Sequence, residues 1–342
     1  MGYGWGDDSS SPSTSSTGGH SHEEARKAYP KPVSTPKSSP SRSSSSSSRS
    51  SGFSKASTPV VSSIDSRRAR ASLPVGKTVK SNSTHPLVIG CDHTGSMKKW
   101  PSIFIEKSAL LGDEVARIAP DHEISFFLIG DGLCDTHAFQ ARDFASGPPL
   151  TDHLNCLYPE GGGGDSAESY ALAAYYYLHH CEINNAVKPI FVMVLDDIDH
   201  GKLYSREIKK FTGDDTTNLN SNEIFAELAK KFSVYIVLHG DHYKSHWQAI
   251  FGEQHVVTMD EPRDIVEIII GIISCELGAA KEFETRSKSR HSDRPDRISR
   301  VSKALTSVRE AAAASEGDEA VGKSVTRSST SSRGLKSRSL DD

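Results

Sequence analysis

Residues 86–96 read Pro-Leu-Val-Ile-Gly-Cys-Asp-His-Thr-Gly-Ser, and this stretch decides the fold class. Its first part, Leu87 to Cys91, is short and continuously apolar, which is typical of a parallel strand that is covered on both faces. Its second part is a polar turn that begins at Asp92. Because ligands of open parallel sheets bind beyond the carboxyl ends of the strands, this junction is the first place to look for a site.

The same pattern of apolar strand and helix repeats along the chain. A second strand is expected at 123–130 and a third at 189–195, and the third again ends in acid, at Asp196 and Asp197. Further strands are expected at 136–144, 233–238 and 255–259, and helices at 102–119, 166–181, 222–232, 246–251 and 263–277. This alternation predicts an α/β, doubly wound, mostly parallel sheet with helices on both faces, a Rossmann-like arrangement.

Composition divides the chain into one domain and two tails. Residues 1–84 contain 27 serines and few large apolar side chains, so they bury too little surface to offset chain entropy and are expected to be disordered. Residues 85–278 hold nearly all the long apolar runs and form the predicted domain. Residues 279–342 are basic and Ser-rich, and are expected to be a second disordered tail with one possible helix at 297–314.

Charge and cysteine usage narrow the class of partner and compartment. The formal net charge is −4. Residues 85–278 carry 14 basic and 29 acidic side chains, whereas residues 1–84 have a net charge of +7 and residues 279–342 a net charge of +4. Because the basic residues of the tails are dispersed, nucleic acid is not an expected partner. Five widely spaced cysteines without a C-x-x-C pair argue against a disulfide framework or zinc ribbon, which predicts a reducing compartment, the cytoplasm or the nucleus.

The longest apolar stretch, residues 265–275, is the only candidate for a membrane segment. It is interrupted by Glu267 and is shorter than the roughly 20 residues that a bilayer requires. No membrane span is therefore expected.

Three polar clusters are predicted to meet at one rim of the sheet. They are residues 92–96 after the first strand, residues 161–168 before a helix, and the acids after the third strand. In Asp92-x-Thr94-x-Ser96, one tight turn aims a carboxylate and two hydroxyls at a common point. Hard oxygen donors without thiolate or clustered imidazole select Mg²⁺, Mn²⁺ or Ca²⁺ rather than zinc or copper.

The string Asp-His-Thr-Gly-Ser-Met after an apolar strand resembles the metal-ion-dependent adhesion site of von Willebrand factor A domains, whose usual form is D-x-S-x-S. The resemblance covers residues 85–278 and extends to Asp196, which matches the family's later acid after a strand. It implies that Thr94 and Ser96 bind the ion directly and that Asp92 and Asp196 bind through water.

One ligand of the family pattern is missing. The family places a Thr in the loop between these clusters, whereas this sequence has four glycines followed by Asp165-Ser166-Ala167-Glu168. This loop resembles that of a subgroup of intracellular and bacterial A domains, in which a Gly-rich loop is followed by E-S-Y. The resemblance suggests that Asp165 or Glu168 takes the place of the missing Thr. The resemblance implies a non-enzymatic module that binds another protein, with an acid of that protein completing the coordination of the metal.

Two alternatives remain open from the sequence. Asp92-His-Thr-Gly-Ser also resembles the nucleophile loop of haloacid dehalogenase-type phosphotransferases, which would make Asp92 the nucleophile, Lys188 the lysine and Asp196-Asp197 the magnesium-binding acids. The second alternative is an A-type scaffold whose metal site is degenerate.

Three other polar residues near these motifs have open roles. Asp131 and Asp135 follow the second strand and either crowd the same rim or are exposed acids of a turn. His93 is expected to be an exposed turn residue rather than a catalytic base.

Overall fold

The computed structural model describes residues 73–164 and 167–314. The strands are β1 Val79–Lys80, β2 Pro86–Asp92, β3 Glu123–Ile129, β4 Phe139–Ala141, β5 Ala167–Glu168, β6 Cys181–Glu182, β7 Ile190–Leu195, β8 Ile198–Asp199, β9 Lys202–Leu203, β10 Leu219–Asn220, β11 Ser233–His239 and β12 Val256–Met259. The α-helices are α3 Trp100–Glu106, α4 Ser108–Ile118, α5 Pro149–Cys156, α6 Tyr170–His179, α7 Ser205–Phe211, α8 Ser221–Lys231, α9 Lys244–Phe251, α10 Ile265–Glu276, α11 Ala280–Arg290 and α12 Pro295–Ala304. Two 3₁₀ turns, η1 Glu253–His255 and η2 Pro262–Asp264, flank β12.

The central sheet has six strands in the order β12-β11-β7-β2-β3-β4. Every neighbouring pair is parallel except β3 and β4, which are antiparallel. The remaining short strands form three two-stranded pairs: β1 with β6, β5 with β8 and β9 with β10. The α/β fold with a mostly parallel sheet is therefore confirmed, and the segment at 136–144 contributes the antiparallel edge strand.

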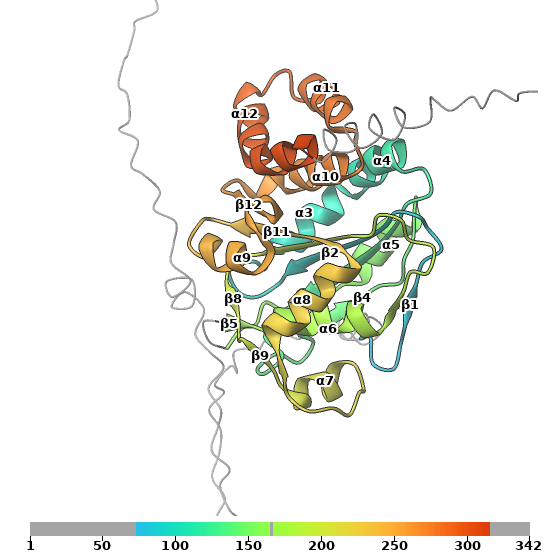
Figure 1. Cartoon of the computed structure of the whole chain (residues 1–342), viewed down its shortest axis with the longest axis vertical. Coiled ribbons are helices and arrows are strands. Elements are labelled where there is room, and N and C mark those ends of the chain that lie inside the picture. Colours follow the sequence, from blue (N-terminus) through green and yellow to red (C-terminus); the bar gives the residue numbers. More distant parts are fainter. Residues whose placement is uncertain (1–72, 165–166, 315–342) are drawn as a thin grey trace, which may run out of the picture.

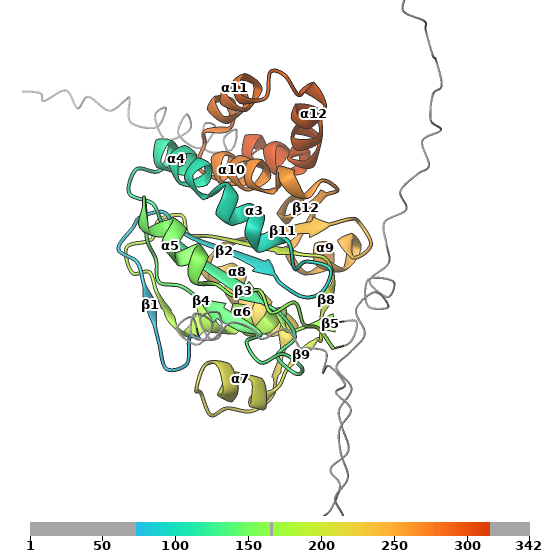
Figure 2. The same cartoon turned by 180° about the vertical axis from the view of Figure 1, so that it is seen from behind.

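Helices cover both faces of the sheet, and the strands divide their side chains between two cores (Figure 1). Leu87, Ile89 and Cys91 of β2 point into the core that α3, α4 and α10 cover. Val88 points the opposite way, into the core beneath α6 and α8. The same two layers are visible from behind in Figure 2. Because side chains alternate along a strand, the direction of Val88 also fixes that of Asp92, which faces α6.

Gly90 is required in β2 by close packing rather than by backbone conformation. A Cβ atom built at this position would lie 1.9 Å from the ring carbon Cζ of Phe127 on the neighbouring strand. The glycine therefore gives Phe127 room to lie across β2 on the face that also carries Asp92.

Within residues 85–278, two expected helices differ from those observed, and two helices were missed. The helix expected at 102–119 is two helices that meet at Lys107, and the helix expected at 166–181 begins only at Tyr170. The missed helices, α5 and α7, are 8 and 7 residues long. Helices of about two turns show too few apolar repeats for periodicity to reveal them.

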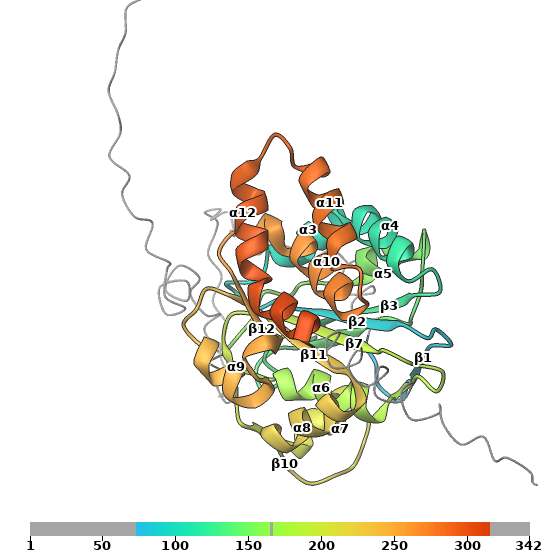
Figure 3. The ribbon, with the colours of Figure 1, turned by 45° about the horizontal axis from the view of Figure 1, so that its top comes forward.

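The predicted domain boundary at residue 278 is wrong. Helices α11 and α12 continue beyond it and pack on α10, as Figure 3 shows. Their buried apolar side chains, and those of the turn of helix that follows, join the core of the sheet: Phe283, Val301, Leu305 and Val308. The physical reason is α10, which is buried along nearly its whole length and therefore needs cover on the side away from the sheet.

The amino-terminal boundary also lies earlier than residue 85. Val79 is 2 % exposed, and β1 pairs with β6. Disorder was also expected for residues 1–72 and 315–342. These residues lie outside those that the structure describes, so their disorder stays a prediction. Within the described ranges, no helix is both long and apolar enough to cross a membrane.

A buried carboxylate holds α11 to α10. Glu267 of α10 is fully buried, and its oxygens accept hydrogen bonds from Arg290, His291 and Ser287. Burial raises the pKa of Glu267, but the hydrogen bonds and charges of Arg290 and His291 together outweigh burial and leave the pKa below its usual value. The ionised side chain is thus the form that stabilises the docked helix.

We expect Glu267→Gln to lower the free energy of unfolding by about 3 kcal/mol, because it leaves the buried partners of the carboxylate unsatisfied. The pKa of Glu267 is depressed on folding, so its contribution is present above the unfolded pKa and is lost as the pH falls through the folded pKa. Urea unfolding at pH 7 and in acid measures both effects. Glu282→Gln, an exposed position on α11, is the matched control; equal stabilities of the two variants would contradict the role of Glu267.

Candidate metal centre

The ends of β2 and β7 bring two of the predicted site acids to one rim. Asp92 is the last residue of β2, and Asp196 follows the last residue of β7. The two strands are hydrogen-bonded neighbours with Cys91 opposite Val194. This register places the two carboxylates beside each other. The charge of Asp196 raises the pKa of Asp92, and the charges of both acids raise the pKa of Cys91.

Asp92 is fully buried and organises the turn that follows it. Its Oδ1 accepts hydrogen bonds from the backbone N–H and the hydroxyl of Thr94, both at 2.6 Å. Its Oδ2 accepts a hydrogen bond from the hydroxyl of Tyr170, the first residue of α6, at 2.5 Å. Burial, with the nearby charge of Asp196, raises the pKa of Asp92 to about 8 despite these hydrogen bonds.

Glu168 is the second buried carboxylate of this rim. It lies in β5, which pairs with β8 directly after Asp196 and Asp197. The side chain is fully buried, and neither of its oxygens has a hydrogen-bond partner among residues 73–164 and 167–314. Burial raises its pKa well above the usual value, and the charges of Asp92 and three other acids add to the rise. A buried carboxylate without donors is destabilising unless a proton or a cation neutralises it.

The Gly-rich loop packs directly on the turn that carries the motif. The backbone N–H of Gly95 donates to the carbonyl of Gly162 at 3.0 Å. A Cβ atom at Gly163 would lie 3.4 Å from Oε1 of Glu168 and 3.5 Å from Cβ of Thr94. Gly163 also has a φ of 105°, a conformation that other residues rarely adopt. The glycines therefore let this loop close over Thr94 and Glu168.

Two acids whose role the sequence left open are buried at this rim. Asp131 and Asp135 are 0 % and 5 % exposed, so they are not the exposed acids of a surface turn. Asp135 accepts hydrogen bonds from the backbone N–H groups of Asp131 and Gly163, each at 3.0 Å. Burial raises its pKa to about 6. Asp135 thus anchors the Gly-rich loop to the turn after β3.

The remaining predicted ligands lie less centrally or outside the described residues. Ser96 is exposed on the turn after Thr94. Asp165 falls outside the described residues. Of the predicted set, the structure therefore gathers Asp92, Thr94, Asp196 and Glu168 around the closed loop.

The expectation that His93 is an exposed turn residue is wrong. Its ring is fully buried, Nε2 lies 3.4 Å from the carbonyl of Ala138, and Nδ1 has no hydrogen-bond partner in the part of the chain that the structure describes. Burial lowers its pKa to about 4. Because successive residues of an extended segment point to opposite sides, His93 points away from Asp92, toward the turn after β3. The ring is a packing element of that turn.

The donor set fits a hard divalent cation. Carboxylates and a hydroxyl meet beneath a glycine loop, and no described residue donates a hydrogen bond to the two oxygens of Glu168. In 73–164 and 167–314, no three His, Cys, Asp or Glu side chains form a cluster ready to bind an ion by themselves. An ion at this rim would thus depend on hydroxyl, water or partner ligands as well as on acids.

Comparisons with known proteins find only solved structures of low similarity. No protein-family model and no curated protein matches the chain. Among solved structures, the chain is similar to proximal thread matrix protein 1 from the mussel byssus (10 % identity, TM-score 0.43, 59 % of this chain and 48 % of that one). The same protein with a zinc-occupied MIDAS motif gives 12 % identity, a TM-score of 0.42, and coverage of 59 % and 47 %.

A second similar structure is the pilus adhesin SpaC from Lactobacillus rhamnosus GG, at 12 % identity and a TM-score of 0.40, covering 61 % of this chain and 32 % of that one. The chain thus spans about half or less of the length of these proteins. Likenesses this weak identify neither a family nor an activity for the chain.

The position of Lys188 counts against a phosphotransferase. Lys188 precedes β7, whereas Asp196 follows it, and a strand of six residues separates their ends by roughly 20 Å. The Lys188 ammonium instead donates to the carbonyl of Glu276 at 2.9 Å. The lysine that this alternative requires therefore lies at the amino-terminal ends of the strands, whereas Asp92 lies at a carboxyl end.

We expect Glu168→Gln to stabilise the protein in a chelator at pH 8. In the wild type this carboxyl group either keeps its proton above its unfolded pKa or ionises without a donor, and both cost free energy. The pKa of Glu168 is raised on folding, so the folded state retains a proton that the unfolded chain releases above about pH 4.5. Wild-type stability should therefore fall as the pH rises above that value, and the variant should show a smaller slope.

Thermal unfolding from pH 5 to pH 9 in a chelator measures this slope. Glu160→Gln, at a less buried acid of the same loop, is the control. Parallel pH profiles for wild type and Glu168→Gln would refute the assignment of Glu168 as a buried, uncompensated carboxyl group.

Proposed function

We propose that the chain is a divalent-metal-dependent protein-binding module of the von Willebrand factor A type. Asp92, Thr94, Ser96 and Asp196 hold a Mg²⁺-like ion, and Glu168 takes the place of the missing loop Thr. Mn²⁺ and Ca²⁺ have the same preference for oxygen donors and are the other candidates. The observation that carries the proposal is the buried Glu168 carboxylate without donors, next to Thr94 and Asp92.

Electrostatics supports a cation rather than an empty acidic pocket. Burial raises the pKa values of both Asp92 and Glu168, which means that the folded chain holds these groups ionised only at a cost. A divalent ion among them removes that cost and displaces their protons. The acids then supply the negative charge that balances the ion, and the turn at Thr94 positions the oxygen atoms that bind it.

The proposed partner is another protein that contributes a carboxylate to the ion. Ser96 is exposed on the metal-binding turn, so this side of the ion is open to an approaching molecule. An acid from a partner would enter there, as the resemblance implies. The proposed compartment is the cytoplasm, with the nucleus as the other reducing possibility.

Catalysis is not part of the proposal. A metal hydrolase needs a base, a nucleophile or a proton donor beside the ion. The His93 ring is buried on the other side of the turn, and Lys188 lies at the opposite end of the strands. The hydrogen bonds that Asp92 accepts from Thr94 and Tyr170 hold its carboxylate in position beside the proposed ion.

Calorimetric titration of Mg²⁺ and Mn²⁺ should show one binding site in the wild type. We expect loss of binding in Asp92→Ala and at least about tenfold weaker binding in Ser96→Ala, because each removes an oxygen donor to the ion. Asp293→Ala, an exposed acid between α11 and α12, should bind as the wild type does. Equal heats in all four proteins would instead support the degenerate scaffold.

A phosphatase assay run on the same proteins separates the enzymatic alternative. We expect no phosphate release above background. Release that depends on Asp92 and is retained in Asp293→Ala would reject the non-enzymatic module.

The open side of the ion can be tested with acetate as a minimal carboxylate. Acetate should displace water from the protein-bound Mn²⁺ and lower its enhancement of water proton relaxation. An unchanged relaxation rate would mean that the ion is closed to external acids, and the adhesion mechanism would fail even if the metal binds.

A further inference from the structure

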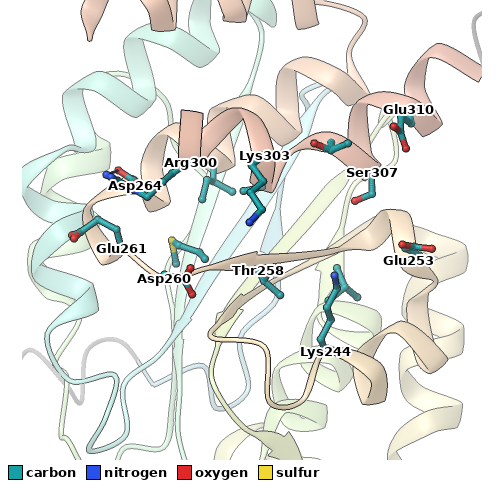
Figure 4. A pocket seen from close by; sticks show the side chains of 15 residues that line it. Lys244, Glu253, Thr258, Asp260, Glu261, Asp264, Arg300, Lys303, Ser307 and Glu310 are labelled. Atoms are coloured by element: carbon teal, nitrogen blue, oxygen red, sulfur yellow. Dashed lines mark hydrogen bonds and ion pairs between the residues drawn. The ribbon is translucent and has the colours of Figure 1, made fainter. Parts of the chain in front are cut away.

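The second edge of the central sheet, strand β12, lies beside a cavity that the proposed metal site does not use. The cavity has a volume of about 360 Å³ and lies between β12, α9 and the helical segments at 300–310. Figure 4 shows Thr258 of β12 at its centre, with Lys303 above and Lys244 below. It is within the size range of sites that take small ligands or short segments of chain.

The outer backbone of β12 is available for hydrogen bonding. The N–H of Gly240 donates to the carbonyl of Met259, which directs the backbone groups of Met259 and, by alternation, those of Val257 toward β11. The N–H and carbonyl of Thr258 therefore point outward. β12 pairs only with β11, and no hydrogen bond among the described residues uses these two groups of Thr258.

The opposite edge of the sheet is closed, and the contrast is informative. At β4, the fully buried side chain of Gln140 donates to the carbonyl of Tyr158 and accepts from its N–H. Its amide thereby bridges this edge strand to the neighbouring chain segment. An edge strand left without such cover is a template for pairing with another strand.

Charges around the cavity define what could pair there. Neither Lys303 nor Lys244 has an ion-pair partner within 73–164 and 167–314. Both ammonium groups extend toward the middle of β12 (Figure 4). The acids lie toward the two ends: Glu253 and Glu310 at the start of the strand, and Asp260 and Glu261 beyond its end. The wall is thus positive at its centre and negative at both ends.

We propose that the edge of β12 binds an extended segment of a partner protein, with acidic residues at its centre and basic residues at both ends. The segment adds as a seventh strand through the N–H and carbonyl of Thr258, and its acids meet Lys303 and Lys244. Val256 to Asp260 spans roughly 13 Å, which limits the paired core to about five residues. Because the charge order is symmetrical, it favours neither strand direction.

We identify the occupant as a segment of another protein from its charge: the order of charges along the cavity wall requires a segment with acids at its centre and bases at its ends. Lys303 and Lys244 approach the strand from opposite faces of the sheet, so two adjacent acids, whose side chains alternate, can reach one lysine each. This inference is independent of the metal site at the carboxyl ends of β2 and β7.

The test uses the full chain and the hexapeptide Lys-Val-Glu-Glu-Val-Lys, labelled for fluorescence anisotropy. We expect saturable binding with a Kd below about 1 mM. The peptide Glu-Val-Lys-Lys-Val-Glu has the same composition in the opposite charge order and should bind at least about tenfold more weakly. An N-methyl group on one central residue of the first peptide should also weaken binding, because it removes a ladder hydrogen bond.

Protein variants locate the binding. Lys303→Glu and Lys244→Glu should each weaken it at least about tenfold, whereas Lys281→Glu, at an exposed position on α11, should not change it. A flat titration, equal binding of the two charge orders, or indifference to N-methylation would overturn the proposal.

Two other occupants are distinguishable outcomes. If the peptide bound only after removal of residues 315–342, the edge would belong to the chain's own C-terminal segment. If sedimentation showed a dimer that the peptide dissociates, the edge would belong to a second copy. Either result would reject an external partner.

Discussion

The crowding of buried carboxyl groups at the carboxyl end of the sheet is the constraint on which the rest of this rim depends. Asp92 and Glu168 are both without exposure to solvent, and the pKa values of both are raised because burial disfavours the charged form. Nothing in a parallel sheet requires acids at these positions, and apolar residues there would give a more stable fold. The cost of burying them is understandable only if the charge does something that packing does not.

The neighbouring elements hold these carboxyl groups in place by hydrogen bonds and close packing. Tyr170 begins α6 and donates to Asp92, so the orientation of this helix is tied to the carboxylate. Asp135 holds the backbone of Gly163, which brings the glycine loop to the other side of Glu168. A change of charge at the rim would therefore act on α6 and on the loop together, the two elements that border any ligand bound there.

The sequence was sufficient for the layers and insufficient for the contacts between distant segments. Continuous apolar runs such as 190–195 predict buried parallel strands because period and length decide them locally. The docking of α11 did not follow, because its helix is polar on average and is held by Arg290 and His291 reaching a glutamate on another helix. Glu267 within an apolar run was the available signal: a buried acid requires a partner, and basic residues follow it in the chain.

The same distinction explains the site. Asp92, Thr94 and Asp196 follow strands and were predicted from the strands, whereas the burial of His93 and Asp135 depends on how the turn after β3 folds over the rim. Glu168 was found by the sequence only as one of two acids after the glycines, and no spacing rule distinguishes them. What distinguishes Glu168 is the pairing of β5 with β8, a contact between residues 31 positions apart that fixes its side chain beneath Gly163. The sequence shows which acids are present, so they could be proposed as ligands. It does not show which of them lack a hydrogen-bond donor, because that depends on which backbone N–H groups the fold brings near each carboxylate.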